Sequence, residues 1–78
     1  MSSWFNIEDV TEKNFWLVGV GEFARAKKEE VTGFEVRPTE TGFQVVLATA
    51  EHKFPIGAEF GAQAGADSKC IELQKKYL

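Results

Sequence analysis

The chain has little chemistry of the kind that metals, disulfides or nucleophilic enzymes require. Its 78 residues include one cysteine and one histidine. A single cysteine excludes an internal disulfide framework, and a free thiol suits a reducing compartment. Zinc needs three or four ligands, and neither CxxC nor HxxxH spacing is present. We therefore expect no metal and no cofactor.

Long apolar runs are also missing. No stretch approaches the roughly 18 apolar residues that a membrane-spanning helix needs. The segment Met1–Phe5 lacks the basic and apolar regions of a signal peptide, and Ser2 in place of glycine removes N-myristoylation. We expect a cytoplasmic protein with no membrane association.

Charge of one sign does not accumulate. Residues 1–39 carry seven acids and five bases, residues 40–78 carry five and four, and the formal net charge is −3. Neither half produces a strong field. This argues against nucleic acid as the main partner and against an acidic DNA mimic.

The length predicts a single domain over residues 1–78. A chain this short buries only about 60% of the surface that its unfolded form exposes. With aromatic residues at 13% of the composition, its stability is expected to come from an aromatic-rich core or from association.

The run from Phe43 to Ala50 has no polar face. Phe43, Val45 and Leu47 alternate with Val46 and Ala48. A strand that faces water on one side shows polar residues at every second position, so this strand is predicted to be covered on both faces. A short chain has little material to cover both faces of a strand, so a partner protein is a candidate to cover the second face.

Several elements follow from local patterns. Residues 14–20 predict a strand, and residues 34–37 and 43–50 predict a hairpin around a loop in which Gly42 is available for a positive φ. Residues 54–60 predict a third strand, which Pro55 makes an edge or bulged strand. Residues 57–66 predict a loop. A final helix capped by Asp67-Ser68 would carry Cys70, Leu73 and Tyr77 on one stripe, although a strand pattern also fits this segment.

The secondary structure of two segments is not decided by the sequence pattern. Residues 6–10 are compatible with a short helical turn. Residues 21–30 are rich in helix formers and favour a helix ended by Gly33, while one long strand over residues 15–27 is the alternative. The predicted fold is α+β, a small antiparallel β-meander with one or two helices packed on one face. A small all-β barrel is the alternative if Gly21–Lys28 continues as strand.

Two motifs are compatible with catalysis or cofactor binding. Gly19–Ala24 matches G-x-G-x-x-A, the dinucleotide-binding pattern, with Glu40 further on. That fold needs several parallel strands, for which the chain is too short, so a tight turn is favoured. His52 and Cys70 could form a nucleophilic pair, but nothing in the sequence places them together. We expect no catalytic residues and no enzymatic activity.

The aromatic residues favour an interaction protein. Phe15 and Trp16 are adjacent and point to opposite faces of a strand, so one small core can hardly bury both side chains. Trp4 and Phe5 are also adjacent and raise the same problem. Exposed aromatics mark interfaces, although a small domain also uses them as core. We expect a non-enzymatic regulator or inhibitor that occupies a partner protein's surface or forms a homodimer. The predicted contacts are Trp4, Phe15, Trp16 and Phe60, with Arg25, Lys27 and Lys28 as polar rim. The alternative function is single-stranded nucleic-acid binding through the Arg25–Lys28 cluster.

Overall fold

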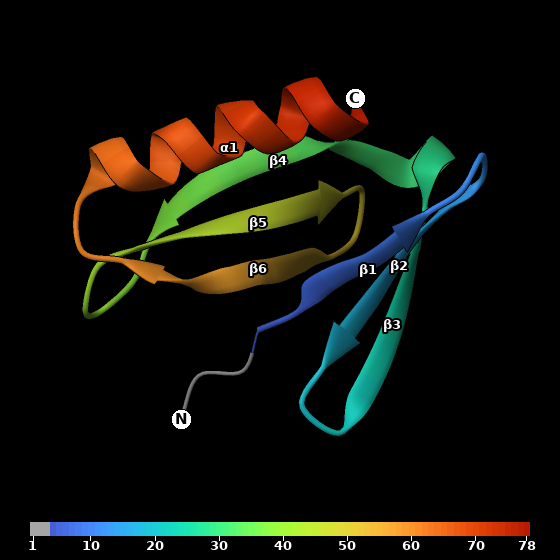
Figure 1. Cartoon of the computed structure of the whole chain (residues 1–78), viewed down its shortest axis with the longest axis horizontal. Coiled ribbons are helices and arrows are strands. Elements are labelled where there is room, and N and C mark those ends of the chain that lie inside the picture. Colours follow the sequence, from blue (N-terminus) through green and yellow to red (C-terminus); the bar gives the residue numbers. More distant parts are fainter. Residues whose placement is uncertain (1–3) are drawn as a thin grey trace.

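The structure is a computed structural model and describes residues 4–78. It contains two three-stranded antiparallel sheets followed by a helix, which makes the fold α+β (Figure 1). The barrel alternative is wrong, because the two sheets formed by the described residues do not close on each other. The first sheet consists of β1 (Asn6–Val10), β2 (Asn14–Gly19) and β3 (Glu22–Lys27), in that order; the second consists of β4 (Val31–Pro38), β5 (Phe43–Thr49) and β6 (Lys53–Phe60), in that order, and α1 spans Gln63–Tyr77.

The segment predicted as a helix over residues 21–30 is instead β3. It pairs with β2 without interruption, from Asn14 opposite Lys27 to Gly19 opposite Glu22. Only Lys28–Glu30 is helical, as one 3-10 turn. Helical charge pairs contribute only about 0.2–0.5 kcal/mol each, whereas the strand gains a complete hydrogen-bonded ladder and buries Ala26. The alternative of one long strand over residues 15–27 is also wrong, because a turn at residues 20–21 divides this stretch into β2 and β3.

The G-x-G-x-x-A motif forms the β2–β3 turn. Gly21 has φ +73°, a left-handed conformation that glycine adopts without steric cost. The tight turn is confirmed, but it joins two antiparallel strands and not the predicted strand and helix. The helical turn considered for residues 6–10 is wrong, because these residues form β1 and pair with β2.

The β4–β5 hairpin and its edge neighbour β6 are confirmed, with β6 at the edge of the sheet. The backbone amide of Phe5 donates to the Pro55 carbonyl at 2.9 Å, and the amide of Gly57 donates to the Phe5 carbonyl at 2.8 Å. The chain just before β1 therefore bridges to β6 at one point. Gly42 has no positive φ; instead, a Cβ there would clash with the Phe60 carbonyl oxygen.

The strand with two apolar faces is the middle strand of its sheet. Val45 and Leu47 face the core, and Val46 on the opposite face is also 0% exposed. Lys53 Nζ on β6 lies 3.1 Å from Glu35 Oε2 on β4, so this ion pair spans β5. Long charged side chains bury apolar surface beneath their stems. The covering of both faces is confirmed, and it needs no partner.

Helix α1 begins at Gln63, four residues before the predicted Asp67-Ser68 cap and inside the predicted loop. Ala62 precedes it without a side-chain cap, so packing sets the start: Ala66 is fully buried, and Gly65 lies against the Phe60 ring. The predicted stripe of Cys70, Leu73 and Tyr77 does face the core.

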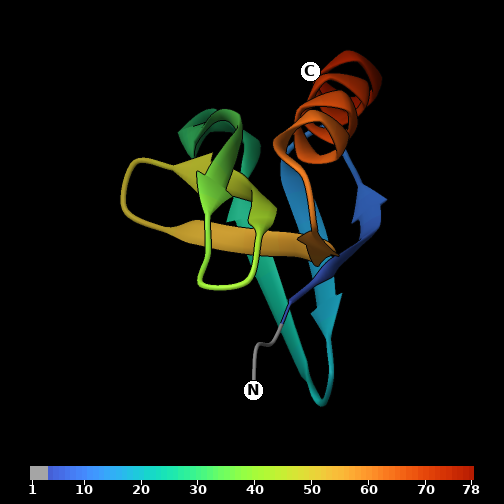
Figure 2. The ribbon, with the colours of Figure 1, turned by 90° about the vertical axis from the view of Figure 1, so that its left-hand side faces the viewer.

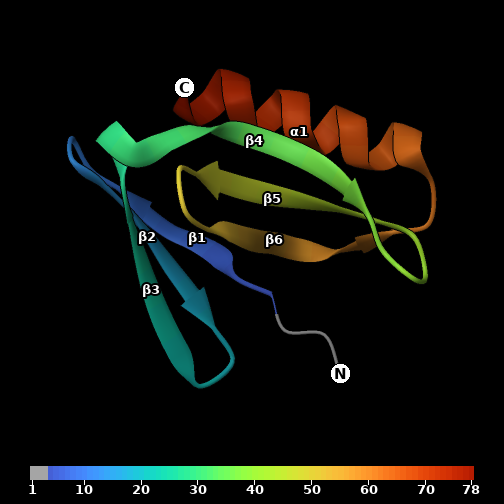
Figure 3. The same ribbon diagram turned by 180° about the vertical axis from the view of Figure 1, so that it is seen from behind.

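The core lies where the inner faces of both sheets meet α1. Helix α1 packs mainly on β4 and β5, and Tyr77 near its end stacks edge-on against Phe15 of β2, with ring centroids 6.1 Å apart. The β2–β3 hairpin extends away from α1 and from the second sheet, as the end view and the rear view both show (Figures 2 and 3). The central core side chains are Phe15, Leu17, Ala26, Phe34, Val45, Leu47, Ile56, Ala66, Cys70 and Leu73.

Candidate protein-binding face

The projecting β2–β3 hairpin carries apolar side chains on the side that faces away from the core. Strand alternation directs Phe15 and Leu17 inward and Trp16 and Val18 outward. On β3 the outward residues are Phe23, Arg25 and Lys27. We call Trp16, Val18, Phe23, Arg25 and Lys27 the outer face.

The exposed apolar surface is concentrated at the end of this face. Phe23 is 82% exposed, Val20 in the turn is 96% exposed, and Trp16 is 40% exposed. Val18 lies directly opposite Phe23. Diagonal neighbours across an antiparallel pair are within reach of aromatic side chains, so Trp16 and Phe23 form one continuous patch.

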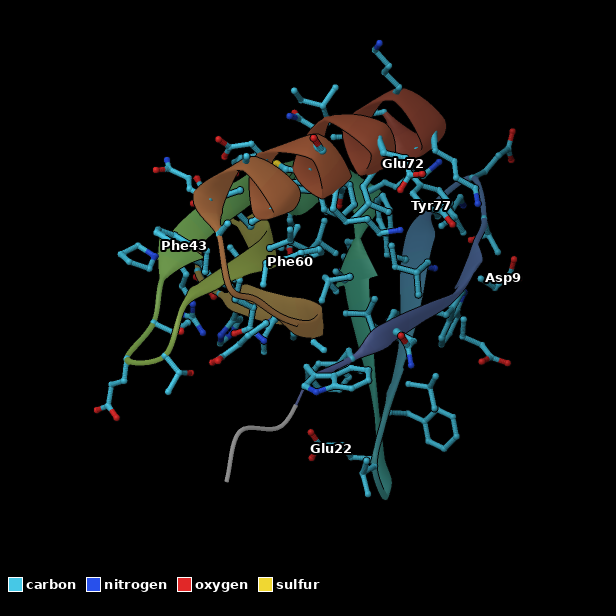
Figure 4. All side chains as sticks on the ribbon, turned by 60° about the vertical axis from the view of Figure 1, so that its left-hand side comes forward. Asp9, Glu22, Phe43, Phe60, Glu72 and Tyr77 are labelled. Carbon is cyan, nitrogen blue, oxygen red and sulfur yellow. The ribbon has the colours of Figure 1, made fainter. Side chains whose placement is uncertain are left out.

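Trp16 is held by its neighbours. Arg25 is its cross-strand partner, and the guanidinium carbon lies 5.7 Å from the centre of the indole ring. This cation–π contact fixes both side chains outward. Beside them is a depression of about 480 Å³ lined by Glu8, Asp9, Trp16, Leu17 and Phe23, so β1 supplies an acidic border. In Figure 4, Asp9 marks this border and Glu22 marks the hairpin end.

A second depression, of about 460 Å³, lies at the opposite end of the same sheet. We call it the basic depression. Its lining combines the β1–β2 turn, β3 and the 3-10 turn: Glu12, Lys13, Asn14, Arg25, Lys27, Lys28 and Glu29. The three predicted rim cations therefore do lie together, and Lys13 joins them.

The remaining predicted contacts lie elsewhere. Phe15 is fully buried in the core and offers no surface to a partner. Trp4 is half-buried just before the Phe5 bridge to β6. Phe60 is half-buried at the end of β6, opposite Phe43 and away from the hairpin. The structure brings together Trp16, Arg25, Lys27 and Lys28 of the predicted set, and separates the other three.

Phe60 belongs to a third depression, of about 440 Å³, between β6, α1 and the start of β1. Its floor includes Ile56, Leu73 and Tyr77, and Figure 4 shows Tyr77 and Glu72 under the helix. Lys69 donates to Glu72 at 2.8 Å and lowers the pKa of that carboxyl group. The rim charges are thus partly neutralised by each other.

Cys70 and His52, the pair considered as a possible nucleophile and base, lie on different elements. Cys70 faces the core from α1, where burial and the charge of Asp67 raise the pKa of its thiol. His52 is exposed in the β5–β6 turn. Among residues 4–78, no three His, Cys, Asp or Glu side chains gather as metal ligands would.

The sequence reasoning missed Val20 and Lys13, and it left Phe23 out of the predicted protein contacts. In the alternative of one long strand over residues 15–27, residues 23, 25 and 27 share one face, and this pattern could have identified Phe23 as a contact. Lys13 has no local signal, because its proximity to Lys28 comes from the pairing of β2 with β3.

No protein-family model matches this chain. Neither the curated proteins nor the solved structures provide a match. Within residues 4–78, no helix has both the length and the apolar character needed to cross a bilayer.

Proposed function

We propose that this chain is a non-enzymatic interaction module that acts as a regulator or inhibitor by occupying the surface of a partner protein. The outer face and Val20 form its contact surface. The observation that carries the proposal is the exposure of Phe23 and Val20 beside Trp16, on a hairpin that projects from the rest of the molecule.

The energetic argument rests on side chains that the core does not use. Full burial of one phenylalanine contributes about 1.5–3 kcal/mol. Interface energy is concentrated in a few aromatic and arginine residues near the centre of a contact. Phe23 and Trp16 supply such anchors, and Arg25 lies directly against the indole ring.

A capture experiment with matched variants tests the proposal. The immobilised chain, Phe23→Ser and Ile71→Ser are each exposed to extract of the native cell. Ile71 is the control because it is an exposed apolar residue, 53% exposed, on α1. We expect a protein retained equally by the wild type and Ile71→Ser but reduced about tenfold by Phe23→Ser, and we expect the purified partner to reproduce this ranking.

Equal retention by all three forms would contradict the proposal. A second copy of the chain is the other occupant to check, by light scattering. A dimer that dissociates in Phe23→Ser but persists in Ile71→Ser would identify the outer face as a homodimer contact. A monomer in all forms would direct attention to a different protein partner.

Single-stranded nucleic acid is the second candidate. The observation that favours it is the presence of Arg25 and Lys27 on the same face as Trp16 and Phe23, since bases stack on aromatics beside cations. Fluorescence anisotropy of a labelled oligothymidine measures this directly. Binding that falls steeply as salt is added would support the candidate, and no binding at low salt would exclude it.

A further inference from the structure

We propose that the basic depression is a binding site for a compact phosphoryl anion that carries two or more negative charges. This inference is independent of the proposed protein-binding function. It rests on the side chains that the β1–β2 turn, β3 and the 3-10 turn bring to one hollow.

The lining carries an excess of positive charge. Four cations, from Lys13, Arg25, Lys27 and Lys28, accompany two carboxylates, from Glu12 and Glu29. The chain as a whole has a net charge of −3. The positive excess is therefore a local property of this depression.

The two carboxylates of the lining form no close ion pair with these cations. Within residues 4–78, the ion pairs closer than 4 Å are Lys53 with Glu35 and Lys69 with Glu72, both on other elements. Like charges gathered at a surface repel one another, and an anion placed among them relieves that repulsion. The Lys13, Arg25 and Lys27 side chains therefore favour a bound anion, whereas the Lys28 ammonium lies against the inward-facing Phe15 ring.

The backbone and two aromatic rings hold the lining in place. The amide of Lys28 donates to the carbonyl of Lys13 at 2.8 Å and ties the 3-10 turn to the β1–β2 turn. Arg25 lies over Trp16, and Lys28 Nζ lies 5.8 Å from the centre of the Phe15 ring. Side chains already positioned lose less entropy when a ligand binds.

The size and borders of the depression favour a compact anion over a nucleic-acid strand. A volume of about 460 Å³ lies within the range of about 300–1,000 Å³ typical of small-molecule sites. A strand would need a cationic track that continues along the face. Here the outer face continues instead toward Glu8 and Asp9 on β1 and the apolar Phe23 on β3.

An NMR titration of the full chain with inorganic pyrophosphate tests the site, with sodium chloride at matched ionic strength as the reference. We expect saturable shifts of the backbone amides of Lys13, Arg25, Lys27 and Lys28 that chloride does not produce. The double variant Lys13→Gln/Lys27→Gln should bind at least tenfold more weakly. The matched control Lys75→Gln/Lys76→Gln on α1 should bind as the wild type does.

Shifts that chloride reproduces, shifts that do not saturate, or an unchanged affinity of the double variant would each overturn the proposal. If that variant fails to fold, the exposed Lys27→Gln serves in its place, with a weaker but measurable loss. Phe23→Ser should leave pyrophosphate affinity unchanged, which separates this site from the protein-binding face.

Oligothymidine provides the second arm. If pyrophosphate displaces it, the shared phosphoryl chemistry of the depression is supported. If it shifts the same four amides and pyrophosphate cannot displace it, the compact site is wrong and a strand-binding face replaces it.

Discussion

Phe15 and Phe23 lie on the two strands of one hairpin in opposite environments. Phe15 is 0% exposed and stacks against Phe34 and Tyr77, whereas Phe23 projects into solvent. Truncation of Phe15 leaves a cavity in the core, whereas truncation of Phe23 does not. Phe15→Ala should therefore lower the free energy of unfolding by about 3–5 kcal/mol. Phe23→Ala should change it by less than about 0.5 kcal/mol. Urea denaturation measures both, and a large loss for Phe23→Ala would mean that this side chain has a structural role.

Gly42 and Gly61 offer a similar comparison. A Cβ at Gly42 would meet the Phe60 carbonyl oxygen, whereas a Cβ at Gly61 would meet nothing within 4 Å. Gly42→Ala should therefore destabilise the fold by about 1–3 kcal/mol, as overpacking does. Gly61→Ala should be neutral or slightly stabilising, because alanine restricts the unfolded chain. In thermal unfolding, Gly42→Ala should have a lower melting temperature than Gly61→Ala. Equal melting temperatures would contradict the close approach of Gly42 to the Phe60 carbonyl.

Cys70 should react slowly with alkylating reagents. Burial raises the pKa of its thiol, and the thiolate is the reactive form. At pH 8 the folded chain should therefore react with iodoacetamide much more slowly than the chain in urea does. Mass spectrometry over time follows both rates. The folded rate should rise as the pH approaches the raised pKa, and equal folded and unfolded rates would contradict the buried position.

At the scale of the elements, β5 depends on its neighbours for cover. The Glu35–Lys53 ion pair spans it, but both side chains are about half exposed. A double-mutant cycle with Glu35→Ala and Lys53→Ala should therefore give a coupling energy of about 0.2–1 kcal/mol. This coupling should decrease in about 1 M salt because the pair is screened. A coupling of zero at low salt would show that the pair does not form in solution.

The elements that local chemistry determines were predictable. The β4–β5 hairpin follows from period-two alternation around a glycine-containing loop, and the α1 stripe follows from the spacing of Cys70, Leu73 and Tyr77. The start of α1 was not predictable, since it depends on Ala66 packing against sheets formed earlier in the chain.

The segment that forms β3 shows why the candidate site was only partly predicted. Its composition favours a helix, and only its pairing with β2 makes it a strand. Once it is a strand, Phe23, Arg25 and Lys27 share one face with Trp16. Sequence reasoning found three of these four residues as contacts. It left Phe23 out of the predicted protein contacts, because the outward position of this side chain depends on the strand assignment.

At the scale of the whole molecule, most of the large apolar side chains are buried or partly buried and a few are exposed. The first sheet and the helix cover the inner face of β5 and bury Phe15, and side chains of β4 and β6 cover its outer face. Most of the apolar side chains that suggested a partner are therefore buried within the chain itself. What remains exposed is concentrated on the β2–β3 hairpin, with smaller contributions from Ile71 and Leu78 on the helical side. The hairpin is therefore the surface on which we propose that a partner protein binds.

Photo-crosslinking in the native cell tests that placement most directly. Position 23 receives the crosslinking amino acid p-benzoylphenylalanine, which keeps an aromatic ring there, and position 71 on α1 receives it in a matched control. Irradiation should join the chain covalently to a protein, or to a second copy of itself, from position 23 and not from position 71. No adduct from position 23, or the same adducts from both positions, would contradict the assignment of the outer face as the binding surface.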